Sequence, residues 1–354
     1  MIKHWWKILG VMLLLYSIIV GLMVPLKPGI LKVEPRAGQA NSQFTTQIST
    51  YNTSFSSQES NGAFAYIKIN DKFKLYADKV KVLGPSLLEI SFSIPALLPH
   101  VQKRWSYTLV INDPKHGPFV RPEAIVLEQA TIDIEKSINA WPSQASRQLN
   151  FTDQKAFPFR SILYESIRNT FYHVPLWFAM VVIFFAAVIY SIKYLRKPNH
   201  LDDMYSRSLT AVGVVFGLLG CATGAIWAKG TWGTWWTFEE IKLNVSAIAM
   251  LIYMAYFILR SALADTEQQA RVSSVYSIFA FVISVPLLFV VPRMVAGSLH
   301  PGNGGNPGFG GEDLDNTLRM VFYPAIIGWI LMGFWLSQLL YRYQKLEEKL
   351  SEEI

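Results

Sequence analysis

Six long apolar stretches constrain this 354-residue chain more than any other feature of its sequence. Five reach about 20 residues, the length that a helix needs to cross a hydrocarbon layer about 30 Å thick, and the first is shorter. We expect membrane-spanning helices at residues 8–24, 174–194, 209–227, 245–259, 275–291 and 320–341. With 51% hydrophobic and only 16% charged residues, the composition also indicates an α-helical polytopic membrane protein.

The first apolar stretch has two interpretations. Lys3 and Lys7 precede it, as they would precede the core of a cleaved signal peptide. Its apolar run is longer than a typical signal core, and no convincing small-residue cleavage site follows closely. We therefore favour a retained membrane helix over residues 1–26.

The distribution of basic residues between the short connections predicts the orientation, because cytoplasmic connections are enriched in lysine and arginine. One side carries Lys3, Lys7, Lys193, Arg196, Lys197, Arg207, Arg260, Arg271, Arg342, Lys345 and Lys349. The short loops of the other side carry Lys229, Lys242, Arg293 and Arg319. We expect both termini, including the charged tail at 342–354, to be cytoplasmic. Because this bias explains the net charge of +7, the charge does not indicate nucleic-acid binding.

A soluble domain is expected between the first two spans, at residues 27–165. Its segments "AFAYIKI", "KFKLYADKVKVL", "LLEISFSI", "WSYTLVIND" and "AIVLEQATIDI" alternate between apolar and polar residues and are separated by turn signals. This pattern predicts a β-sandwich on the outer side of the membrane. We interpret His100, His116, Asn52 and Asn150 as solvated polar residues of its loops.

Two features of the predicted spans concern chemistry. The single cysteine, Cys221, lies inside the third span, so the sequence indicates neither a disulfide nor a zinc site built on thiolates. Ser191, Thr210 and Thr223 are interpreted as hydroxyls that pack helices together.

Two of the six histidines flank the tryptophan-rich segment "GTWGTWWTFEE" at the outer ends of the spans. His4 and His200 fall on the cytoplasmic side. His173 precedes Pro175 at the start of the second span, and His300 begins a loop rich in glycine, residues 301–311, that can fold closely over a ligand.

This arrangement suits a planar iron porphyrin. Two imidazoles could approach a metal from opposite faces, and the tryptophans between them offer an aromatic floor. Cationic side chains that could pair with propionates are Lys229, Lys242, Arg293 and Arg319. The simpler interpretation is that the tryptophans form only the aromatic belt found at membrane surfaces.

The segments "FYHVPLWFAM", "GLLGCATGAIWAKGTWGTWWTFEEIKLN" and "SLHPG" resemble the three signature regions of the haem exporter protein C family of cytochrome c maturation. The resemblance covers roughly residues 165–341. It implies six spans in the bacterial inner membrane and a haem site on the periplasmic side, where the tryptophan-rich segment, expected as a loop at 227–242, lies between two histidines.

Carried across by position, the resemblance implies that His173 and His300 are axial ligands of a transiently bound haem b. It implies that Trp232, Trp235 and Trp236 line the surface on which the porphyrin rests, and that Trp227, Gly230 and Gly233 belong to the same segment. The implied partners are a membrane-tethered periplasmic haem chaperone and the subunits of an ABC-type transporter.

The chain departs from the family pattern in two places. After the paired tryptophans the family continues with a small or apolar residue and then Trp-Asp, whereas this chain has Thr237, Phe238 and Glu239. Counting without a gap places Glu239 at the position of the aspartate, and Glu240 beside it is the alternative. The second departure is the inserted β domain, since the first outer loop of the family is short.

Two other functions remain open from the sequence. One is a haem lyase of the other cytochrome c assembly route, whose members share the tryptophan motif but usually carry further histidines inside the membrane. The other is an adhesion or scaffold protein whose β domain carries the function. The sequence has no Cys-x-x-Cys-His motif, no Walker A stretch and no recognisable Ser/His/Asp motif. No histidine of this chain lies in the middle of a predicted span, so we favour a haem carrier over a haem lyase.

Overall fold

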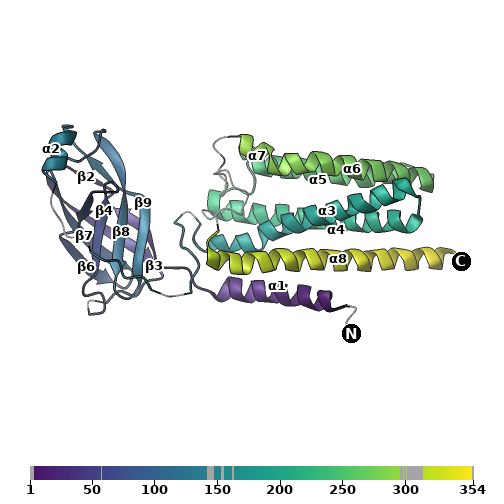
Figure 1. The fold of residues 1–354 in the computed structure, drawn as a ribbon, viewed down its shortest axis with the longest axis horizontal. Coiled ribbons are helices and arrows are strands. Elements are labelled where there is room, and N and C mark those ends of the chain that lie inside the picture. The colour runs from purple at the N-terminus through teal and green to yellow at the C-terminus, as the bar shows by residue number, and fades with distance from the viewer. Residues whose placement is uncertain are drawn as a thin grey trace. The chain divides into compact units, whose positions relative to one another are not determined.

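A computed structural model of the chain describes residues 4–56, 58–141, 147–152, 155–161, 163–295, 298, 300 and 314–352. The chain divides into two compact units. One comprises Met1–Val24 and Glu165–Ile354 and is helical, and the other comprises Pro25–Tyr164 and is mainly β (Figure 1). The β unit is therefore an insertion between the first two long helices of the chain.

The β unit consists of two sheets. The first has the strand order β1-β3-β7-β6 and the second has the order β2-β9-β8-β4-β5. The strands are β1 (Gly29–Glu34), β2 (Ala37–Gln39), β3 (Ser42–Tyr51), β4 (Phe64–Lys68), β5 (Lys74–Tyr76), β6 (Lys79–Gly84), β7 (Leu87–Ile94), β8 (Arg104–Asp113) and β9 (Gly117–Glu128). Neighbouring strands are antiparallel except for β2, which runs parallel to β9.

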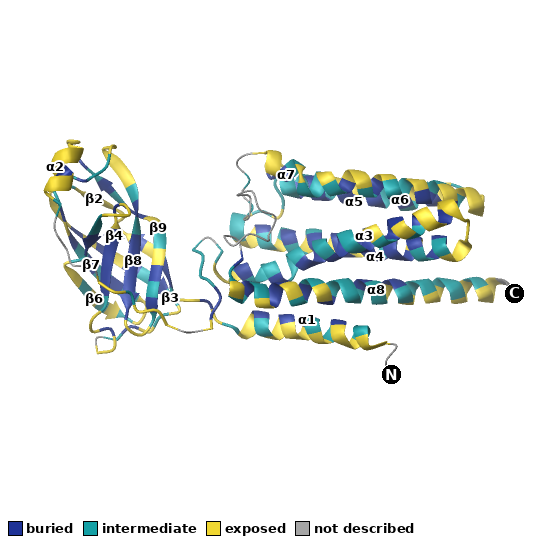
Figure 2. Ribbon diagram, in the orientation of Figure 1, coloured by how far each residue is buried: buried dark blue, intermediate teal, exposed yellow. Residues whose placement is uncertain are grey.

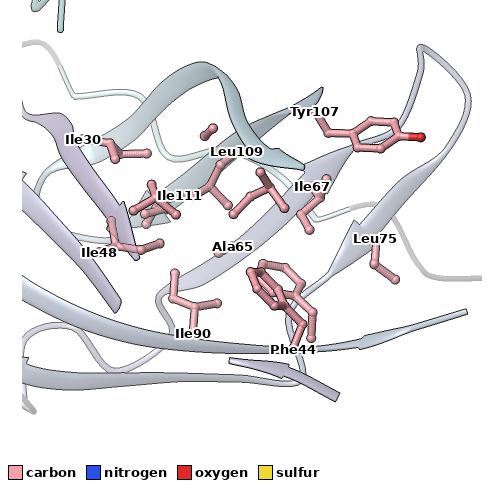
Figure 3. Close-up of a cluster of buried hydrophobic side chains, with 14 of the residues drawn as sticks. Ile30, Phe44, Ile48, Ala65, Ile67, Leu75, Ile90, Tyr107, Leu109 and Ile111 are labelled. Carbon is pink, nitrogen blue, oxygen red and sulfur yellow. The ribbon is translucent and has the colours of Figure 1, made fainter. Parts of the chain in front are cut away.

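The core of the β unit lies between its sheets. The alternating residues of the strands meet there, with Ile48 from β3, Ile67 from β4 and Leu109 from β8 fully buried (Figure 3). Two predicted segments differ in detail. Residues 72–83 form two strands, because the chain turns at 77–78, and β9 ends at Glu128 before the short helix α2 (Ile134–Asn139).

The helical unit contains six helices, in the described part of the chain, that are long and apolar enough to cross a membrane. They are α1 (Trp5–Met23), α3 (His173–Arg196), α4 (His200–Trp232), α5 (Ile241–Ser261), α6 (Thr266–Phe289) and α8 (Asn316–Glu352). The short helices η2 (Tyr164–Phe171) and α7 (Val291–Met294) lie before α3 and after α6. The prediction of six apolar spans with a separate β-sheet region is thus confirmed.

The outward faces of these helices are apolar and exposed (Figure 2). Ile8 on α1, Val282 on α6 and Leu251 on α5 are each more than 60% exposed. Large apolar side chains in such positions are expected to contact lipid, because water would disfavour so continuous an apolar surface.

A row of glycines on α4 allows α3 and α5 to approach it closely. Gly213, Gly217, Gly220 and Gly224 recur at helical spacing, so they share one face of α4. Cβ atoms built at these positions would lie within 2.9 Å of, in order, Phe184, Met250, Trp177 and His173. Close backbone approach through small residues is the usual way in which membrane helices pack. The last glycine of the row therefore sets the position of His173.

Candidate functional site

Ends of all six long helices lie at the end of the helical unit that carries His173 (Figure 1). Helices α3, α5 and α8 begin there, whereas α1, α4 and α6 end there. The connections between them bring together His173, the tryptophan-rich segment and His300, which are distant in the sequence.

The ring of His173 is fixed against α4. Its Nδ1 lies 3.1 Å from Oγ1 of Thr223. That hydroxyl donates its proton to the carbonyl oxygen of Leu219 at 2.8 Å, so it accepts a hydrogen bond from His173. We therefore assign the proton of the neutral imidazole to Nδ1. This leaves the lone pair of Nε2 available, which is the usual state of a histidine that ligates a metal.

His300 lies within contact distance of His173 and two tryptophans. The ring centres of His300 and His173 are 6.4 Å apart, with an angle of 36° between the ring planes. Trp227 and Trp232 lie with ring centres 5.5 Å and 6.4 Å from that of His300. The two histidines predicted to flank the tryptophans thus lie side by side.

Trp227 and Trp232 belong to the end of α4 and are not in a loop. The helix continues through Trp232 and ends at Gly233, whose φ of +79° is the left-handed conformation that glycine adopts most readily at a helix end. The two indole rings are 5.1 Å apart, and Nε1 of Trp227 donates a hydrogen bond to Oγ of Ser166 at 3.1 Å. The expected loop at 227–242 is therefore shorter, because Gly230 does not interrupt the helix and Gly233 does.

The segment after Gly233 presents aromatic side chains outward. Trp235 is 58% exposed and Phe238 is 86% exposed, whereas Trp236 is partly buried. Thr234 Oγ1 donates to the carbonyl oxygen of Trp236 at 2.8 Å, and Asn244 Nδ2 donates to that of Phe238 at 2.7 Å. These bonds hold the backbone of an exposed aromatic segment in a defined conformation.

The two adjacent glutamates have different surroundings. Glu239 is exposed. Glu240 is fully buried, and its Oε1 accepts a hydrogen bond from the backbone N–H of Lys242 at the start of α5. The hydroxyl of Ser298 donates to the Glu240 carboxyl group, with distances of 2.8 Å and 3.0 Å to its two oxygens. Among the described residues, Glu240 of this pair joins the tryptophan-rich segment to Ser298, two residues before His300.

Four cationic side chains surround this end of the helices. Lys229 is in the last turn of α4, Lys242 in the first turn of α5, Arg293 in α7 and Arg319 in the first turn of α8. Lys229 Nζ donates to the carbonyl oxygen of Gly233 at 2.9 Å, and Arg319 Nη1 donates to Asn316 Oδ1 at 3.1 Å. Lys229 and Arg293 are exposed, whereas Lys242 and Arg319 are partly buried.

Three contacts of this region were not anticipated from the sequence. Thr223, interpreted as a packing hydroxyl, contacts His173, and its position four residues before Trp227 would have placed it on the same helix face. Ser166 and Ser298 carry no pattern that predicts their contacts. The glycine-rich residues 301–311, expected to fold over a ligand, lie outside the described residues.

The interpretation of His116 as a solvated loop residue is wrong. Its side chain is 8% exposed, and its Nδ1 lies 2.7 Å from Oδ1 of fully buried Asp113. The backbone N–H of Ser54 donates to Nε2 at 3.0 Å. The histidine therefore pins the turn between β8 and β9 to the segment that follows β3. His100 is partly exposed and stacks on Trp105 at 4.6 Å.

Comparison with known proteins matches the helical part of the chain that follows the β unit. A family model described as "Heme exporter protein C" matches residues 161–353. The chain is similar to proteins of that name from Paracoccus denitrificans and Haemophilus influenzae. The first is 27% identical over 167 residues, covering 47% of this chain and 68% of the relative. The second is 25% identical over 195 residues, covering 55% of this chain and 74% of the relative. A third relative, from Marchantia polymorpha, is named as a putative ccmC-like mitochondrial protein of cytochrome c biosynthesis. It is 29% identical over 124 residues, which are 35% of this chain and 51% of the relative.

Proposed function

The chain belongs to the haem exporter protein C family, and we propose that it binds haem b and delivers it during cytochrome c maturation. The observation that carries the proposal is the pairing of His173 and His300 beside Trp227 and Trp232. We further propose that this end of the helices faces the periplasm of a bacterial inner membrane, with both termini in the cytoplasm.

The spacing of the two imidazoles fits an iron with two histidine ligands. A metal lies about 2 Å from a coordinating imidazole nitrogen, so two rings that face each other across it have centres about 6 Å apart. The ring centres of His173 and His300 are 6.4 Å apart. The family name supports haem as the group that brings the iron, since a porphyrin supplies the four remaining ligands.

The chain's own residues would bind, orient and shield the cofactor. Thr223 holds the His173 ring so that Nε2 is available, and Trp227 and Trp232 restrict the ring of His300. The cations Lys229, Lys242, Arg293 and Arg319 would pair with the propionates. Haem brings the iron. In this proposal the protein binds haem by coordination and contact and forms no covalent bond to the porphyrin.

The exposed aromatic residues support handover to another protein. Trp235 and Phe238 are accessible, and large exposed aromatic side chains are typical of residues that contribute strongly to protein contacts. We propose that they contact the porphyrin and then the periplasmic haem chaperone that receives it. ABC-type transporter subunits of the same maturation system are the proposed membrane partners.

A haem lyase is the alternative, and the positions of the histidines favour the carrier. None of the six histidines lies in the middle of a membrane helix, since His173 and His200 are the first residues of α3 and α4. Expressing the full chain with an apocytochrome and no chaperone separates the two functions. Covalent c-type haem in that strain would contradict the carrier proposal.

Haem binding itself is tested by purifying the full chain after expression with haem supplementation and recording its visible spectrum. We expect a Soret band that is strongly reduced in His173→Ala and His300→Ala and unchanged in His4→Ala, a histidine outside the site. If the wild-type chain lacks a Soret band even when the chaperone is co-expressed, the proposed function fails.

A further inference from the structure

Glu240 holds a position from which it can control the placement of His300. It is the residue that precedes α5, and it is fully buried although a carboxyl group loses favourable hydration when it leaves water. Such burial is tolerated where hydrogen bonds replace the lost hydration. Its carboxyl oxygens accept hydrogen bonds from the Lys242 backbone and from the Ser298 hydroxyl.

Ser298 connects this carboxyl group to the backbone of His300. Its hydroxyl donates to Glu240 and accepts a hydrogen bond from the backbone N–H of His300 at 3.2 Å. A serine hydroxyl has one proton and two lone pairs, so it can serve both contacts at once. The serine oxygen accepts from the backbone N–H two residues later, and this short-range hydrogen bond fixes the local turn.

The connection is specific to one of the two glutamates. Glu239, the residue that falls at the family's aspartate position when no gap is counted, is exposed, and its backbone N–H donates to Oγ1 of Thr237. Within the part of the chain that the structure describes, Glu240 is the one of the pair that contacts the segment carrying His300. The chain therefore contains a matched internal control, since the two residues are chemically identical neighbours with different contacts.

We propose that Glu240 is a positioning residue for haem ligation, which acts through Ser298 to hold His300 at the ligating distance from His173. The inference rests on the proposed function, because it assigns a role within the same haem site. Glu240 itself does not touch the iron. Its carboxyl group connects the end of the tryptophan-rich segment, the start of α5 and, through Ser298, the His300 backbone. The position of His300 relative to the tryptophans is thereby fixed.

The test compares haem-loaded full-length variants by the spin state of the iron and the rate at which haem dissociates to excess apomyoglobin. Removal of a hydrogen-bonding partner that orients a metal ligand typically lowers metal affinity by about 10-fold to 100-fold. We expect Glu240→Ala and Ser298→Ala to lose the low-spin bis-histidine signature and to release haem about 10-fold faster. Ser298→Thr, which keeps the hydroxyl, and Glu239→Ala should retain the wild-type signature and rate.

Glu240 also caps α5, so a folding defect must be separated from a positioning effect. Glu240→Ser keeps a side-chain oxygen that can cap the helix but is too short to reach Ser298 at the same time. We expect this variant to unfold at the wild-type temperature without haem and yet to show the ligation defect. The double variant Glu240→Ser/Ser298→Ala should be no worse than either single variant, because both remove the same connection.

Each outcome has a separate meaning. Wild-type ligation and dissociation in Glu240→Ser and Ser298→Ala, together with a defect in His300→Ala, would overturn the inference and leave the proposed function standing. Unchanged ligation in His300→Ala would show that His300 is not a ligand and would also overturn the inference, whereas a wild-type chain without a Soret band would end the proposed function on which the inference rests.

Discussion

Gly224 lies directly against His173, and a Cβ atom built on this glycine would be 2.8 Å from Cε1 of the imidazole ring. Carbon atoms do not approach so closely, so any larger residue at position 224 has to move the ring or separate α3 from α4. The closeness of two helix backbones is therefore a condition for the placement of the proposed ligand.

The first prediction follows from this contact. Gly224→Ala should lower haem affinity by about 10-fold, since displacing a metal ligand by a fraction of an ångström weakens its bond. Haem titration of the purified protein measures the effect. Gly230→Ala is the matched control, because a Cβ built there has no atom of another described part of the chain within 4 Å and the helix is regular. Equal affinities in the two variants would contradict the proposed position of His173.

The hydroxyl of Thr223 provides a second prediction. Thr223→Ala removes the acceptor for the Nδ1 proton of His173, whose ring can then rotate, so we expect haem affinity to fall by about 10-fold. Thr223→Ser keeps the hydroxyl and should bind as the wild type does. Resonance Raman or absorption spectra of the two haem-loaded variants report the iron ligation directly. A defect of equal size in Thr223→Ser would mean that the methyl group, and not the hydrogen bond, matters.

The exposed aromatic residues lead to a third prediction. Trp235→Ala and Phe238→Ala should change the free energy of unfolding of the haem-free protein by less than about 0.5 kcal/mol, because exposed side chains contribute little to folding. Haem affinity or transfer to the chaperone should nevertheless fall severalfold, since an aromatic contact contributes about 1 kcal/mol. Thermal unfolding in detergent and a transfer assay measure the two properties. Full transfer by the double variant would show that these residues only line the membrane surface.

His116 in the β unit leads to the fourth prediction. His116→Ala leaves the buried carboxyl group of Asp113 without this partner, so we expect the β unit to lose about 1–3 kcal/mol of stability. Amide hydrogen exchange should accelerate at Ser54, whose backbone N–H loses its acceptor. Haem affinity should be unchanged. His100→Ala should destabilise the β unit less, since His100 is partly exposed, and equal losses in both variants would argue against the assigned role of His116.

Apolar length and alternation in the sequence predict most of the fold. The six spans are visible because a membrane helix needs a long apolar run, and the sandwich strands are visible because one face of each strand is buried. Helix ends are less predictable. Gly230 and Gly233 look equivalent in the sequence, yet α4 continues through the first and ends at the second, where the backbone adopts a positive φ. That choice depends on the whole segment that follows.

The candidate site was predictable in its histidines and tryptophans and not in the residues that position them. Motif spacing identifies His173 and His300 because they flank the aromatic segment. Whether Glu239 or Glu240 turns inward depends on Ser298, which is distant in the sequence and approaches only after α5, α6 and α7 have folded. Local sequence patterns do not predict a contact between residues so far apart in the chain. The contacts of Ser166 with Trp227 and of Thr223 with His173 were unpredictable for the same reason.

The central claim is that His173 and His300 together ligate one haem iron, and electron paramagnetic resonance of the ferric, haem-loaded full chain tests it most directly. We predict a low-spin bis-histidine signal in the wild type, its loss in His173→Ala and in His300→Ala, and its return in each variant when imidazole is added. A wild-type signal that persists in either alanine variant without imidazole would contradict the account.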